Sequence, residues 1–210
     1  MRSFKHLHRR SLAWTTAGLG AMAVAGALAM TMGLTAASAT SAAARTASSF
    51  SFKLVPSPNV AACLPNAGGN ATITPGKLND TMKVSVHGMP PNAGFDLFVI
   101  QQPLAPFGVS WYQTDVQANQ YGTGSATVRG VFDVETFSVS LGGTATFAPT
   151  HQYHLGLWFN DPSVPFNLGC EPGATSPIVT PFNGAQHAGI QVVNTSEFPV
   201  SAGPLSKVHR

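Results

Sequence analysis

The sequence predicts an all-β protein, an immunoglobulin-like or jelly-roll antiparallel β-sandwich that follows an N-terminal signal peptide. Three observations support this prediction. Apolar residues recur at every second position in several short segments, which is the pattern of a half-buried strand. Glycine and proline interrupt these segments at short intervals, with 21 and 16 residues in a chain of 210. After residue 40, no stretch shows the longer apolar period of an amphipathic helix.

The clearest strand pattern lies in the middle of the chain. Met82, Val84 and Val86 alternate with polar residues, so one face of this segment is expected to be buried. A run of glycine, proline and asparagine separates it from a second strand at 95–101, and further prolines separate that strand from a third at 109–117. Three strands joined by short loops predict an antiparallel core.

Shorter segments on both sides show the same features. Further strands are expected at 50–55, 71–74, 125–131, 132–139, 144–148, 153–160 and 188–194. Residues 164–184 are expected to form a long proline-rich loop, and the tail from Ser196 onward looks irregular. About eight to ten short strands without a helix are typical of a sandwich or a barrel.

The first 39 residues have the composition of an export signal. The first ten carry four basic residues and no acid, an uncharged apolar stretch follows, and Ala-Ser-Ala ends the segment. Arg9 and Arg10 match the twin-arginine signal in part, so the twin-arginine and the general export routes both stay open. Cleavage is expected before Thr40 or Arg45. Residues 40–49 would then be a disordered leader and 50–210 a single sandwich domain.

The alternative to cleavage is a permanent anchor. The apolar stretch is long enough to span a bilayer, which takes roughly 20 residues. The protein would then stay on the outer face of the cytoplasmic membrane instead of being secreted. The high alanine and glycine content of this apolar stretch favours cleavage of the segment over its insertion into the membrane.

The export signal also explains the basic character of the chain. The whole chain carries 11 basic and 8 acidic residues, but four of the basic residues and none of the acids lie in the signal. The remainder therefore has 7 basic against 8 acidic residues, a net charge of −1. This balance excludes a nucleic-acid partner and an anionic-membrane surface, so contact with a membrane is expected only through an uncleaved signal.

The two cysteines, Cys63 and Cys170, predict one disulfide. A lone pair of cysteines in an exported chain usually forms a bond, because the compartment is oxidising. Two thiols cannot by themselves make a zinc site, and their separation excludes a C-x-x-C redox motif.

Motifs of the common enzyme classes are absent from the sequence after residue 40. The serine-hydrolase motifs G-x-S-x-G and S-x-x-K do not occur, nor do the glycine fingerprints of phosphate and dinucleotide sites. We therefore predict no catalytic residue and no cofactor. Paired-carboxylate chemistry would require two acids to converge in one cleft. The acids available for such a pair are Asp96, Asp115, Asp133, Glu135 and Asp161.

The closest histidine pair in the predicted domain is His151 and His154. Residues three apart on a strand point to opposite faces, so the two imidazoles could share an ion only if His151 lay before the strand. We predict no metal site.

Two adjacent aromatic pairs, Trp111–Tyr112 and Trp158–Phe159, lie in expected strands. Neighbours on a strand point to opposite faces, so Trp158 would face outward if Phe159 faces the core. An outward-facing ring with polar neighbours could bind a sugar or a peptide. The alternative is that both faces are covered, by the second sheet and by the proline-rich loop. The candidate binding residues are Trp158, His154, Asn160, Asp161, Trp111 and Tyr112.

Several longer motifs carry a family resemblance. The run GMPPNAGFDLFV is similar to the turn-and-strand entry of secreted immunoglobulin-like modules. The segments FDLFVIQ, APFGVSWYQ, YHLGLWFN and TPFNGAQHAGIQV resemble an uncharacterised family of secreted actinobacterial proteins, over residues 80–205. This resemblance implies export and a β fold. It carries no assigned activity and therefore no functional residue.

Two functions remain compatible with the sequence. The first is an exported, non-catalytic β-sandwich that binds a glycan, a peptide or a cell-surface partner. The alternative is a secreted hydrolase or metal-dependent enzyme on the same scaffold.

Overall fold

The computed structural model describes residues 48–132, 153–181 and 187–208, which form an all-β antiparallel sandwich. Eight strands make one antiparallel sheet in the spatial order β5-β4-β7-β10-β1-β2-β3-β6, and β8 pairs with β9. The strands are β1 Phe50–Pro56, β2 Gly68–Thr74, β3 Asp80–His87, β4 Gly94–Ile100, β5 Ser110–Gln117, β6 Gly124–Gly130, β7 His154–Phe159, β8 Thr180–Pro181, β9 His187–Ala188 and β10 Gln191–Asn194. The predicted fold class is confirmed, while its immunoglobulin-like or jelly-roll character stays a prediction.

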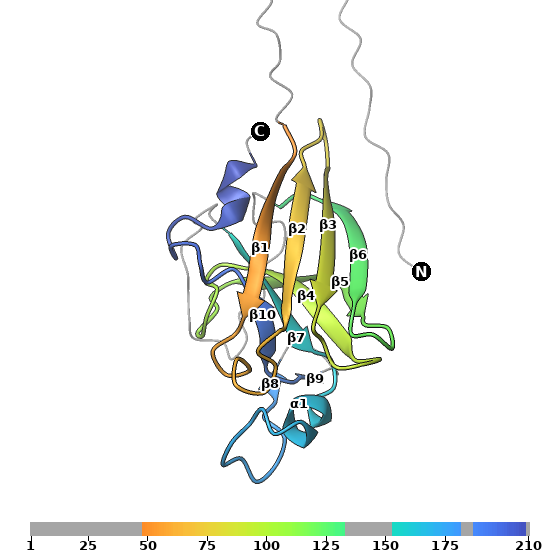
Figure 1. Cartoon of the computed structure of the whole chain (residues 1–210). Helices are drawn as coiled ribbons and strands as arrows, with labels where there is room; N and C mark the ends of the chain where they lie inside the picture. Colours follow the sequence, from red (N-terminus) through yellow and green to blue (C-terminus); the bar gives the residue numbers. More distant parts are fainter. Residues whose placement is uncertain (1–47, 133–152, 182–186, 209–210) are drawn as a thin grey trace, which may run out of the picture. The chain divides into compact units, whose positions relative to one another are not determined.

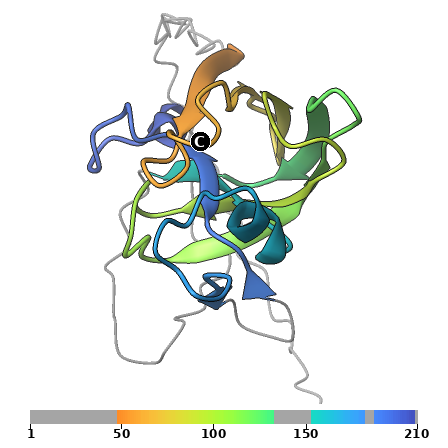
Figure 2. The same cartoon turned by 60° about the horizontal axis from the view of Figure 1, so that its bottom comes forward.

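Strand β1 joins two layers of this sheet. Its residues from Phe50 to Leu54 pair with β2, and its last two residues, Val55 and Pro56, pair with β10. Figure 1 shows β1, β2, β3 and β6 in front, with β10, β7 and β4 behind them, and Figure 2 shows the layers facing each other. We call β1-β2-β3-β6 the front sheet and β5-β4-β7-β10 the back sheet.

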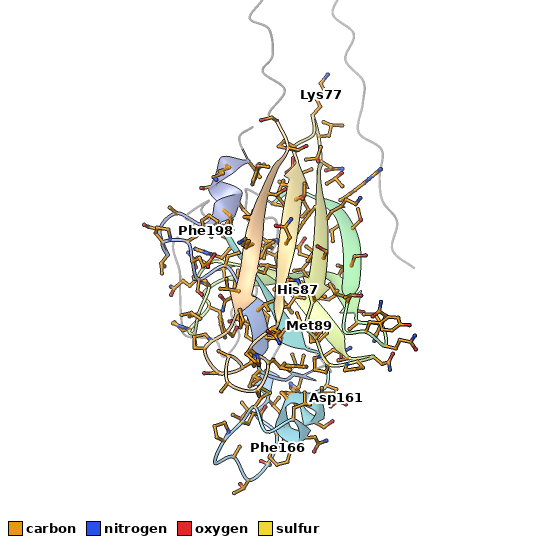
Figure 3. The ribbon with its side chains drawn as sticks, in the orientation of Figure 1. Lys77, His87, Met89, Asp161, Phe166 and Phe198 are labelled. Carbon is orange, nitrogen blue, oxygen red and sulfur yellow. A yellow bond between two sulfur atoms is a disulfide. The ribbon has the colours of Figure 1, made fainter. Side chains whose placement is uncertain are left out.

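The main core fills the space between the two sheets. Met82, Val84 and Val86 of β3 are buried there, as their alternation predicts. The back sheet contributes alternate residues of β4 and β7, including Leu97 and Leu157. Burial of one such side chain contributes roughly 1.5–3 kcal/mol. At the side of β1, Phe198 packs edge-on against Phe52 with ring centroids 6.0 Å apart (Figure 3).

Most strand predictions agree with the structure, and the differences have physical causes. Strand β2 begins at Gly68, earlier than expected, because its two glycines lie in the ladder and do not form a turn. A methyl group on Gly69 would lie 2.7 Å from the backbone oxygen of Ser85, so the close approach of β3 favours glycine there. The strand expected at 188–194 is divided between β9 and β10. The strands expected at 132–139 and 144–148 lie outside the described residues, except Phe132.

The expectation of no helix was wrong. A one-turn helix, α1 Ser163–Asn167, lies in the segment expected to be a loop, and a 3₁₀ turn, η1 Pro204–Lys207, lies in the tail. Proline at the start of a helix needs no N–H partner and already has a helical φ, so Pro162 and Pro204 begin these turns instead of preventing them. In the described part of the chain, no helix is long and apolar enough to cross a membrane.

The predicted disulfide between Cys63 and Cys170 is present, with Cα atoms 5.2 Å apart. It links the turn segment after β1 to the chain that follows α1. Cys170 is buried against the main core, so the bond anchors two loops at the same end of the sandwich.

Replacing both cysteines by alanine should lower the free energy of unfolding. The bond closes a loop of 107 residues, for which the chain-entropy model gives about 4.7 kcal/mol and measured values are usually about 2–4. Urea denaturation of the wild type and the double variant measures the loss. Reductant should destabilise the wild type but leave the double variant unchanged, and equal stabilities of the two proteins would contradict the prediction.

Candidate functional site

The outer face of the back sheet is covered at β7, so the expectation of an exposed aromatic platform at Trp158 was wrong. Trp158 is only 1% exposed, and His154 of the same face is fully buried. All six residues of β7 are buried. The alternative, that both faces of this strand are covered, agrees with the structure, although the residues packed on Trp158 come from β4, the β4–β5 loop and β9 and not from the proline-rich loop.

A small second core covers Trp158. We call it the outer cluster; its members are Phe98, Ile100, Trp158, Ala188 and the partly buried Phe107. The Trp158 ring is edge-on to Phe98 and to Phe107, at centroid distances of 5.5 and 5.0 Å. Phe107 lies in the loop between β4 and β5 and has a positive φ of 57°, which is uncommon for a bulky residue. Hydrogen bonds across this loop, such as Phe107 N–H to Leu104 O at 2.9 Å, hold the ring in place.

Trp158 also lies over a glycine of its own strand. A methyl group on Gly156 would lie 2.7 Å from the Trp158 ring and 2.6 Å from Gln191 Nε2. The indole therefore shields a stretch of strand backbone that has no side chain of its own.

A pocket of about 350 Å³ lies beside Trp158, and we call it the Trp158 pocket. Besides Trp158 of β7, its lining comes from the turn after β1, the β4–β5 loop, the chain at Ile178 and Thr180, and the chain at Ile190 and Gln191. At its rim, Leu104 is 39% and Ile178 48% exposed. The lining residues are Ser57, Pro58, Asn59, Leu104, Ala105, Phe107, Trp158, Ile178, Thr180, Ile190 and Gln191.

Three buried polar side chains hold one wall of the pocket. Ser57 Oγ donates to Gln191 Oε1 at 2.9 Å, and Asn194 Nδ2 donates to both Ser57 Oγ and Gln191 Oε1, at 2.9 and 2.8 Å. Gln191 Nε2 donates to Pro103 O at 3.1 Å, which connects β10 to the β4–β5 loop. Buried polar groups need such partners, so this network fixes the relative positions of the pocket segments.

His154 lies at the other end of β7, where hydrogen bonds hold its buried side chain. Its Nδ1 lies 3.0 Å from Thr195 Oγ1, and its Nε2 lies 3.1 Å from Val200 O. The carbonyl can only accept, so Nε2 donates to Val200 O. Burial lowers the pKa of His154, and hydrogen bonds with the backbone of Val200 and Thr195 oppose the shift in part. The imidazole does not line the Trp158 pocket.

The two residues of the other aromatic pair, Trp111 and Tyr112, lie on opposite faces of the back sheet, as expected for neighbours on a strand. Trp111 is buried in the main core, edge-on to Tyr153 at 4.6 Å. Tyr112 is 52% exposed on the outer face and edge-on to Phe98 at 5.8 Å. Tyr112 thus lies next to the outer cluster but does not line the pocket.

Two acids do converge on this outer face. Asp96 of β4 is the direct cross-strand partner of Asp115 of β5, and Tyr112 Oη donates to Asp115 Oδ1 at 2.7 Å. Partial burial raises the pKa of Asp96 to about 6, and the charge of Asp115 and a hydrogen bond with it add to the shift. Asp96 therefore carries a proton below about pH 6. Asp133 and Glu135, the other two acids on one expected strand, lie outside the described residues.

Asn160 and Asp161 lie apart from the Trp158 pocket. Both are exposed at the end of β7, and Figure 3 shows Asp161 beside α1. Asp161 Oδ1 accepts a hydrogen bond from Ser163 N at 2.8 Å. Bonds from the Ser163 side chain and backbone lower the pKa of Asp161, which therefore supports the start of the helix.

The described residues contain no group of three or more histidine, cysteine or acidic side chains that could hold a metal ion. His151 lies outside the described residues, so the expected relation between His151 and His154 is not tested. Both ring nitrogens of His154 are already engaged in hydrogen bonds.

In comparisons with protein-family models and with curated proteins, the chain matches none. The resemblance to secreted actinobacterial proteins therefore stays a prediction. The candidate site rests on the geometry of the described residues alone.

Several pocket residues carried no recognisable signal in the sequence. Ser57 and Gln191 are 134 residues apart, and nothing in the sequence relates one to the other. Gln191 and Phe107 lie in the segments TPFNGAQHAGIQV and APFGVSWYQ, but the resemblance that these segments carry assigns no role to either residue. The one local signal was an apolar side chain directly after a proline, since Phe107 follows Pro106 and Ile178 follows Pro177.

Replacing Trp158 by alanine should lower the free energy of unfolding by about 3–5 kcal/mol, because the change empties a large buried site. Gly156→Ala should also destabilise, by about 1–3 kcal/mol, since the new methyl group would overlap the indole. Chemical denaturation measures both. Tyr112→Ala serves as the control, with an expected loss of about 1 kcal/mol or less. A loss for Trp158→Ala as small as that of the control would show that the indole is not a core residue.

Asp96→Asn should stabilise the protein at pH 8 but not at pH 4. The folded-state pKa of Asp96 is about 6 against an ordinary 3.8, so the wild type loses stability as pH rises between these values. Water screens this half-exposed pair, so we expect a gain of about 1 kcal/mol at pH 8. Urea denaturation of both proteins at the two pH values measures it. His154 titrates in both proteins, so its effect cancels in the difference, and a gain independent of pH would contradict the prediction.

Proposed function

We propose that the protein is an exported, non-catalytic binding module of the immunoglobulin-like or jelly-roll kind, whose ligand binds in the Trp158 pocket. The observation that carries the proposal is the pocket itself. Its volume of about 350 Å³ falls in the range of small-molecule sites, roughly 300–1,000 Å³. Such sites are lined mainly by apolar and aromatic side chains with a few placed polar groups, as this one is.

The walls of the pocket support a preformed site. The disulfide restrains the turn that carries Ser57 to Asn59 and the loop that leads to Ile178. The Gln191 amide fixes the β4–β5 loop through Pro103. A site held in this way loses little freedom on binding, which favours affinity.

Export is supported by the basic head, the apolar stretch and the small-residue exit of residues 1–39. A disulfide between the two cysteines is compatible with an oxidising compartment. The protein would thus bind its ligand outside the cell, either secreted or held at the outer face of the cytoplasmic membrane.

A second candidate function, hydrolysis, is favoured by the convergence of Asp96 and Asp115. Two carboxyl groups that share a proton act as acid and base in some hydrolases. This pair lies on strands β4 and β5, with Asp115 exposed, and neither acid lines the Trp158 pocket. The convergence is equally explained as a proton-sharing bond between two strands, so we give precedence to binding.

Amide-detected NMR of ¹⁵N-labelled protein tests the binding proposal. A mixed set of sugars, blocked dipeptides and small aromatic molecules is added to the wild type, and the side-chain N–H signals of Trp158 and Gln191 are followed. We expect at least one compound class to shift both signals. In Ile178→Asn, which makes the pocket rim polar, the response should weaken.

Val179→Asn is the matched control, because Val179 is 45% exposed, adjacent in sequence and outside the pocket lining. It should respond like the wild type. If no class shifts these signals, or if both variants respond equally, the Trp158 pocket is not the binding site.

A further inference from the structure

The Trp158 pocket also indicates which chemical class it accepts, provided that the proposed binding function holds. We propose that its ligand is a small neutral molecule, largely apolar, with one hydrogen-bond acceptor. The pocket volume of about 350 Å³ is near the lower end of the range for ligand sites, roughly 300–1,000 Å³, which favours a small molecule.

Charge is the first argument. Within the described residues, every side chain that lines the pocket is neutral. A charged ligand would give up its hydration without gaining a counter-ion, and burial of an unpaired charge is costly. Acids, amines and phosphates are therefore disfavoured.

Polarity is the second argument, and it separates an apolar ligand from a sugar. Both acceptor positions of Gln191 Oε1 are taken by Ser57 and Asn194, and Nε2 already donates to Pro103 O. Gln191 has only one further amide hydrogen to offer. The Ser57 hydroxyl donates to Gln191 and accepts from Asn194. Of the other lining side chains only Asn59 and Thr180 are polar, so a sugar would leave most of its hydroxyl groups without a side-chain partner.

Shape is the third argument. Trp158 is only 1% exposed, so the partly buried ring of Phe107, edge-on to Trp158 at 5.0 Å, is the aromatic surface offered to an aromatic or cyclic ligand. The exposed rim residues Leu104 and Ile178 would close over an apolar molecule and lose their contact with water. The acceptor of the ligand would meet the remaining amide hydrogen of Gln191 or the rim group Asn59.

Matched probes test the class by isothermal titration calorimetry on the folded, disulfide-bonded protein. Acetophenone has a ring and one carbonyl acceptor, and benzoate has a similar shape with a negative charge. Glucose and a blocked leucine dipeptide represent sugars and peptides. We expect acetophenone to bind at least about tenfold more tightly than benzoate, with a negative heat-capacity change, and glucose not to bind at the same concentrations.

The same two variants separate the possible outcomes. Ile178→Asn should weaken acetophenone binding severalfold and Val179→Asn should not, with thermal melting confirming that both are folded. If glucose, benzoate or the dipeptide binds best and Ile178→Asn weakens it, the ligand class is wrong and the binding function stands. If no probe responds to Ile178→Asn, both proposals fail.

Discussion

Burial of β7 on both faces is the constraint on which the rest of the structure depends. One face of this strand packs against the front sheet, and the other carries Trp158 over Gly156. A sandwich of two sheets can cover only the inner face, so the outer face must be covered by loops. The β4–β5 loop supplies Phe107, and β9 supplies Ala188. Two cores of unequal size follow from this one requirement.

The sequence predicted the elements that bury a single face. In β3 the alternation of Met82, Val84 and Val86 with polar residues reports directly which side meets the core. In β7 the same pattern misled, because His154 and Gly156 resemble residues of a solvated face. His154 is buried because Thr195 and Val200 satisfy both ring nitrogens. These partners lie more than 40 residues away, and no local pattern reveals them.

The candidate site could be predicted only in part, again because the residues that surround it are distant in the sequence. The sequence singled out Trp158, and the structure places it beside the pocket but buried, among segments that the chain brings together only on folding. Asn160 and Asp161, its neighbours in sequence, lie elsewhere. Asp96 and Asp115 lie opposite each other because of the register in which β4 and β5 pair. The amino-acid composition of two strands does not give their register. The sequence identifies the two acids but does not show that they lie opposite each other on paired strands.

The Trp158 pocket is itself a consequence of covering a sheet with loops. The side chains of two packed sheets interdigitate along the whole interface. A loop contacts a sheet only where its turns direct side chains toward the sheet. The outer cluster is therefore packed around Phe107 but ends at the rim formed by Leu104 and Ile178. The disulfide and the Gln191 network hold these loops in fixed positions, so the space between them cannot collapse. The Trp158 pocket therefore stays open between the loops. Its lining is mainly apolar because the sheet face beneath it is buried.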